Sequence, residues 1–93
     1  MEIKFGTNFA IAVGNATQGL HLALAALDIG VGDEVCTTPL SWISSASCIL
    51  MQNAVPIFCD IEPKSLSICA ESLAKNISPR TKAVIIVHLH GYP

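Results

Sequence analysis

The sequence predicts an α/β fold in which a mostly parallel β-sheet carries helices on both faces. Four short segments rich in β-branched and aromatic residues alternate with three segments whose apolar residues recur at helical spacing. This order is typical of parallel sheets with right-handed crossovers. The last strand-like segment contains the run 83–87, which is apolar throughout instead of alternating. We expect such a run in a strand that is covered on both faces in the middle of a sheet.

Composition and charge exclude several classes of protein. Of the 93 residues, 52% are hydrophobic and 13% are charged, so the chain is too apolar to be disordered. No window approaches the roughly 18 uninterrupted apolar residues of a membrane span. The net charge of −2 leaves no basic patch, so neither nucleic acid nor an anionic membrane is a predicted partner. For so short a chain the apolar fraction is high, which indicates a piece of a larger fold.

The first expected strand covers 9–13 and runs directly into Gly14, Asn15, Ala16 and Thr17. A turn of small and hydroxyl residues between a strand and a helix presents free backbone N–H groups at a positive helix end, which suits a phosphate. The same residues equally suit an ordinary helix N-cap made by Asn15 or Thr17. The residues alone leave both interpretations open.

The first expected helix, over 17–29, has apolar residues on more than one face, so we expect it to be covered on more than one side. The segment 30–33 contains two glycines, which favour a left-handed cap and a tight turn at the end of this helix. The next expected elements are a strand over 34–38, a helix over 41–52, a strand over 55–60, a helix over 70–77 and a strand over 82–89.

Trp42 is the only tryptophan, and it follows the carboxyl end of the second expected strand. In open α/β sheets, ligands bind at that edge. An indole there either stacks on a planar ring of a ligand or covers the end of the sheet as a core aromatic residue. Asp60 closes the third strand, where capping the following turn is the more usual role than acting as a base.

Histidines and cysteines give no metal or redox motif. His88 and His90 are two apart on the last expected strand, but no carboxylate or thiol stands at a ligand spacing, so no metal site is predicted. The four cysteines form no CxxC pair, and no secretory signal precedes them. We therefore expect reduced, mostly buried thiols in a cytoplasmic protein.

Five ordered blocks, at 12–24, 32–35, 38–42, 55–61 and 79–91, closely resemble the amino-terminal part of the DegT/DnrJ/StrS family of pyridoxal-phosphate-dependent sugar aminotransferases. The resemblance extends from about Phe5 to Pro93. It implies that residues 1–93 are part of the large domain of a fold-type I transferase, truncated at both ends and without an internal boundary.

The resemblance also implies a cofactor site for pyridoxal 5′-phosphate. The turn at Ala16 and Thr17 would hold the cofactor phosphate, and Trp42 would stack on the pyridine ring. The chain departs from the family where Asn15 and Ala16 replace the usual Ser-Gly before Thr17. Ser47 stands where the family often has Asn, and His90 where it often has Tyr.

By resemblance, the function is transfer of an amino group, from glutamate, to a keto group of a nucleotide-linked sugar for cell-surface polysaccharides or antibiotics. The resemblance further implies a homodimer. No catalytic residue is assigned, because none of Lys4, Lys64, Lys75 and Lys82 matches the lysine that forms the Schiff base. The chain alone is therefore expected to be inactive, and a non-catalytic remnant or interaction module is the alternative. The resemblance also implies that the strand over 9–13 lacks its usual neighbouring strand, which comes later in the sequence in the family's sheet.

Overall fold

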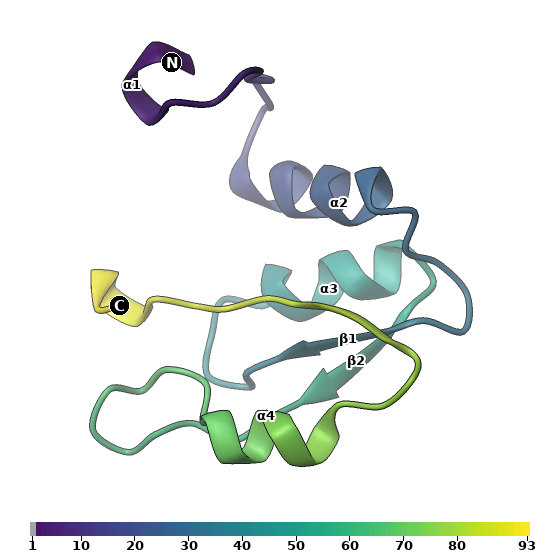
Figure 1. Ribbon diagram of the computed structural model, residues 1–93, viewed down its shortest axis with the longest axis vertical. Coiled ribbons are helices and arrows are strands. Elements are labelled where there is room, and N and C mark those ends of the chain that lie inside the picture. Colours follow the sequence, from purple (N-terminus) through teal and green to yellow (C-terminus); the bar gives the residue numbers. More distant parts are fainter. Residues whose placement is uncertain (1) are drawn as a thin grey trace.

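The computed structural model describes residues 2–93, which form a three-stranded parallel sheet with helices packed around it (Figure 1). In chain order the elements are α1 (Glu2–Phe5), α2 (Ala16–Ala26), β1 (Glu34–Thr37), α3 (Ser44–Met51), β2 (Val55–Phe58), α4 (Ala70–Asn76), β3 (Thr81–Val84) and the 3-10 turn η1 (Leu89–Gly91). The strand order is β2-β1-β3, and both pairings are parallel. The predicted α/β class is confirmed, and the ends of the three expected helices differ from their expected positions by at most three residues.

The core lies between β1, α3 and the inner face of α2. Figure 1 shows α3 between the sheet and α2, with α4 on the other side of the strands. The buried apolar cluster draws on α2, β1, α3 and the turns that follow the two helices: Leu24, Ile29, Val35, Cys48, Ile49 and Ala54. The other face of α2 is exposed at Leu22 and Leu27, so this helix is covered on one side only.

The end of α2 differs from the expected glycine cap. The helix stops at Ala26, and the left-handed residue is Asp28, with φ of 57°. The N–H of Ile29 donates to the carbonyl of Leu24 at 3.2 Å, which is the bond of a Schellman-type ending. The chain leaves the helix early because Ile29 turns inward and is buried in the core. Gly32, with φ of 89°, forms the tight turn that follows.

The expected strand over 9–13 is not formed. The segment joins no sheet, and Phe9 is 85% exposed. A strand needs a neighbouring strand for its backbone N–H and C=O groups. In the described part of the chain, β2 and β3 already occupy both sides of β1, so no central position is left for this segment.

The prediction for the last strand is wrong in length and in position. β3 ends at Val84 and lies at an edge of the sheet, while β1 is the central strand. Pairing ends here because β1 itself ends at Thr37, after the N–H of Ile85 donates to the carbonyl of Cys36 at 2.8 Å. Beyond that point Ile86 is 58% exposed.

A charged cluster joins the amino ends of β1 and β3. The carboxylate of Glu34, which is buried, accepts a hydrogen bond from the Ser78 hydroxyl at 2.6 Å. It also accepts from Arg80 Nε at 2.9 Å and Nη2 at 2.6 Å. The hydrogen bond from Ser78, followed by that from Arg80, lowers the pKa of Glu34. The cluster therefore fixes the edge strand to the central strand at the end of the sheet away from Trp42.

No helix in residues 2–93 has the length and apolar character that a membrane crossing requires.

Candidate functional site

The N-terminus of α2 is capped in a way that leaves backbone donors available. The side chain of Asn15 accepts from the N–H of Gln18 at 2.9 Å, which confirms the expected cap. In turn, the Gln18 side chain accepts from the N–H of Gly14 at 2.9 Å. A Cβ at position 14 would lie 2.6 Å from that Gln18 oxygen, so this close approach favours glycine.

Two of these donors are the N–H groups of Ala16 and Thr17. Both residues lie in the first turn, where no partner exists within the helix. Among the described residues, no hydrogen bond from outside the helix reaches them either. Capping and phosphate binding are thus compatible at this turn. Ala16 is not among the residues with positive φ, so the replacement of the family's glycine causes no backbone strain.

A hydrogen bond between side chains joins this turn to the start of α3. The hydroxyls of Thr17 and Ser44 lie 2.6 Å apart, and Ser44 is only 7% exposed. Trp42 precedes Ser44 by two residues and follows the carboxyl end of β1. The structure therefore brings the two regions of the predicted cofactor site together, although they are distant in the sequence.

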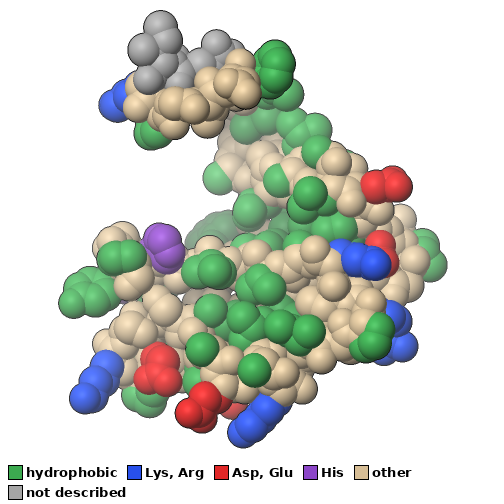
Figure 2. Space-filling model, viewed as in Figure 1, with side chains coloured by type: hydrophobic (Ala, Val, Ile, Leu, Met, Phe, Trp, Pro, Cys, Tyr) green, Lys and Arg blue, Asp and Glu red, His purple; other side chains and the backbone are tan. Residues whose placement is uncertain are grey.

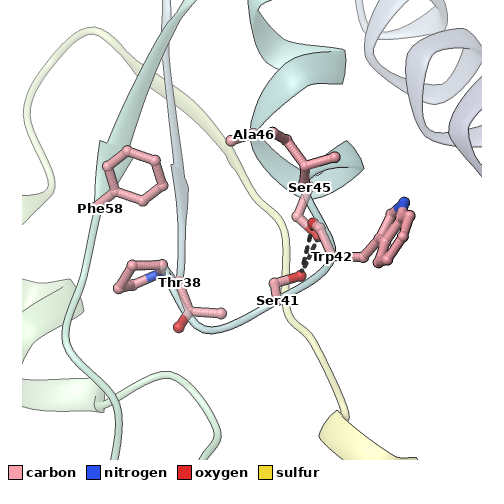
Figure 3. A pocket seen from close by; sticks show the side chains of 8 residues that line it. Thr38, Ser41, Trp42, Ser45, Ala46 and Phe58 are labelled. Carbon is pink, nitrogen blue, oxygen red and sulfur yellow. Dashed lines mark hydrogen bonds between the residues drawn. The ribbon is translucent and has the colours of Figure 1, made fainter.

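Trp42 is not a core residue, since it is 79% exposed. Figure 3 shows its indole directed away from Phe58 and out past the start of α3. It borders a hollow of about 270 Å³ that is also lined by Thr38, Pro39, Ser41, Ile43, Ser45, Ala46 and Phe58. An exposed indole beside an open hollow is available to a planar ring, and this favours the stacking interpretation of Trp42.

Sequence reasoning missed two hydrogen bonds between side chains in this region. Ser44 contacts Thr17, and the hydroxyls of Ser41 and Ser45 lie 2.6 Å apart beside the hollow. The closely spaced serines at 41, 44 and 45 were the available signal, but only the helix start at Ser44 decides which of them points toward α2.

The donor set fits a phosphorylated aromatic cofactor in part. Two backbone N–H groups and a hydroxyl suit a phosphate, and the indole suits a ring face. None of Lys64, Lys75 and Lys82 lines the hollow, so no amine from these residues is positioned to form a Schiff base there.

The histidines and cysteines lie outside this arrangement. His88 and His90 are exposed beyond the end of β3, with His90 in η1, so they do not share a strand face as expected. Across residues 2–93, no three His, Cys, Asp or Glu side chains are grouped so that they could hold a metal ion.

All four thiols are free, and three of them are buried, as the sequence predicted. Burial raises the pKa of Cys48. Burial, and then the neighbouring Cys36, raises the pKa of Cys59 to about 11. These two thiols therefore stay protonated near neutral pH and are poor nucleophiles.

Comparison with known proteins assigns the family. The profile of the DegT/DnrJ/EryC1/StrS aminotransferase family matches residues 2–93. The chain belongs to this family. It is 44% identical over 86 residues to the L-glutamine:2-deoxy-scyllo-inosose aminotransferase of Streptomyces fradiae. The matched region covers 92% of this chain and 20% of that protein.

Solved structures agree with this assignment. The aminotransferase from Psychrobacter cryohalolentis superimposes with a TM-score of 0.93 at 41% identity, covering 99% of this chain and 23% of that one. NtdA from Bacillus subtilis, with its cofactor PMP bound, gives a TM-score of 0.92 at 30% identity, covering 97% of this chain and 21% of that one. The chain thus spans about a fifth of the length of these relatives.

These neighbours confirm the expected fold type and cofactor class. They are fold-type I enzymes, and the aminotransferases of the family depend on pyridoxal 5′-phosphate, of which PMP is the amine form.

Proposed function

We propose that this chain is part of a pyridoxal-phosphate-dependent aminotransferase in which Ala16 and Thr17 bind the cofactor phosphate and Trp42 stacks on the pyridine ring. The observation that carries the proposal is the 2.6 Å hydrogen bond between the hydroxyls of Thr17 and Ser44, which holds the α2 turn beside the segment bearing Trp42. When bound, the cofactor supplies the electron sink for amino transfer. Residues 1–93 then form part of one large domain and contribute no catalytic residue.

The proposed reaction moves an amino group from glutamate to a keto group of a nucleotide-linked sugar, in the synthesis of cell-surface polysaccharide or antibiotic sugars. Membership of the aminotransferase family supports the reaction type. The name of the relative from Streptomyces fradiae gives L-glutamine and 2-deoxy-scyllo-inosose as its substrates. Glutamine therefore belongs beside glutamate in any test of the donor.

We also propose that the intact protein is a cytoplasmic homodimer whose partners are a nucleotide sugar and an amino donor, without nucleic acid or membrane. The free, buried thiols fit a reducing compartment. The exposed apolar side chains on α2 and around Trp42 provide surface for further protein contacts.

The test uses the full-length product of the gene that encodes this chain. Replacing Trp42 with Ala removes the stacking surface and should weaken retention of pyridoxal 5′-phosphate about tenfold, whereas Trp42→Phe should largely preserve it. Cofactor absorbance after dialysis measures retention in each protein. Unchanged retention in Trp42→Ala would show that the indole does not contact the ring.

The function itself is tested by incubation with a nucleotide-linked keto sugar and either donor, followed by detection of the amino sugar. A protein that binds no cofactor and transfers no amine would instead be the non-catalytic remnant.

A further inference from the structure

Ser44 holds the turn of the proposed cofactor site in place, but nothing above assigns it a part in binding the phosphate. Its side chain is nearly buried at the first residue of α3, and its hydroxyl lies 2.6 Å from that of Thr17. The nearby Ser45 hydroxyl is already engaged with Ser41 at 2.6 Å, so it does not substitute for Ser44.

Counting donors and acceptors fixes the direction of this bond once a phosphate is present. A hydroxyl donates one proton and accepts through its lone pairs, whereas a fully ionised phosphate only accepts. Thr17 must therefore give its single proton to the phosphate, and the proton between the two hydroxyls must come from Ser44. Hydrogen bonds in such a chain strengthen one another, most of all when the final acceptor is charged.

We propose that Ser44 is a positioning residue that donates to Thr17 Oγ1 and so directs the Thr17 proton toward the cofactor phosphate. This inference rests on the proposed function, because it requires the phosphate to lie at the N-terminus of α2. Ser44 acts through Thr17 and needs no contact of its own with the cofactor. It also ties the two helix starts together, since the bond spans from α2 to α3.

The test compares two ligands that differ in the phosphate alone. The full-length gene product, freed of cofactor, is titrated by calorimetry with pyridoxamine 5′-phosphate and with pyridoxamine. Neither compound forms a Schiff base with a lysine. The dissociation constant for pyridoxamine divided by that for pyridoxamine 5′-phosphate therefore reports the phosphate contacts. Ser44→Ala should lower the affinity for pyridoxamine 5′-phosphate about fivefold and leave that for pyridoxamine unchanged. Ser44→Thr, which keeps a hydroxyl, should restore the ratio.

Controls separate this role from a purely structural one. Ser47→Ala, one turn further along α3, should leave the ratio unchanged. Thr17→Val should lower the ratio further, and adding Ser44→Ala to it should have no additional effect. If Ser44→Ala weakens both ligands equally, or neither, Ser44 has no phosphate-directed role. An unmodified protein that binds neither ligand overturns the proposed function as well, whereas one that responds to Thr17→Val but not to Ser44→Ala overturns only this inference.

Discussion

The charge of Glu34 stabilises the pairing of β1 with β3. Because hydrogen bonds from Ser78 and Arg80 lower its pKa in the folded chain, its stabilising effect is present above the ordinary glutamate range, near pH 4.3, and is lost as the pH falls through the lowered value. Acidification below about pH 4 should therefore loosen the pairing of these two strands.

Hydrogen exchange of the peptides covering β1 and β3 measures this effect in the full-length gene product. Glu34→Gln should reduce protection at pH 7 and remove most of its further loss on acidification. Glu62→Gln, at an exposed position, should behave like the unmodified protein. Equal acid sensitivity in the Glu34 variant would show that other carboxyl groups control this edge.

At the scale of residues, the sequence suggested candidate site residues but not the contacts between them. The resemblance pointed to Thr17 and Trp42 because both lie in recognisable motifs, one at the start of a helix and one after a strand. Ser44 was not anticipated, since a serine's partner depends on how two helices cross, and helix periodicity carries no information on that angle. The ion pair between the buried Glu34 and the exposed Arg80 was missed for the same reason, as 46 residues separate its members.

At the scale of elements, the end of α2 shows a residue type that does not suit its backbone conformation. Asp28 takes a left-handed conformation that costs a non-glycine residue about 1–2 kcal/mol, which is partly offset by the greater flexibility of glycine in the unfolded state. We expect Asp28→Gly to stabilise the protein by about 0.5–1 kcal/mol, seen as a higher melting temperature. Asp33→Gly should have the opposite effect, because the Asp33 carboxylate accepts from the N–H of Gly30 at 3.0 Å. A lower melting temperature for Asp28→Gly would mean that its side chain is needed.

The strands show why element type was easier to anticipate than element position. Segments 34–37 and 55–58 form where the β-branched pattern placed them. The equally strand-like segment 9–13 does not, because a strand forms only where a neighbour offers a free edge. The apolar run 83–87 likewise has the pattern of a fully buried strand, but its residues are not fully buried at the edge of this sheet.

At the scale of the whole molecule, the apolar excess of the sequence appears as exposed surface. Figure 2 shows hydrophobic side chains across the middle of one face, with the charged side chains toward its margins. Phe9, Ile11 and Trp42 are each more than three-quarters exposed. Exposed apolar side chains of this kind are typical of contact surfaces, and β3 adds an open edge to the sheet. This fits a chain that spans about a fifth of its relatives.

We therefore expect the 93-residue chain, produced alone, to self-associate through the open side of β3. Ile86→Lys places a charge directly beyond that edge strand and should lower the average mass in sedimentation or light scattering over a range of concentrations. Val31→Lys is the matched control, because Val31 is 87% exposed but lies in the turn between α2 and β1. Circular dichroism of both variants verifies that the helices remain.

Equal solubilisation by the two lysines would indicate a general charge effect. A monomer at every concentration with cooperative melting would show that the exposed surface does not drive association. Only a selective effect of Ile86→Lys identifies the edge strand as the surface that a larger sheet would cover.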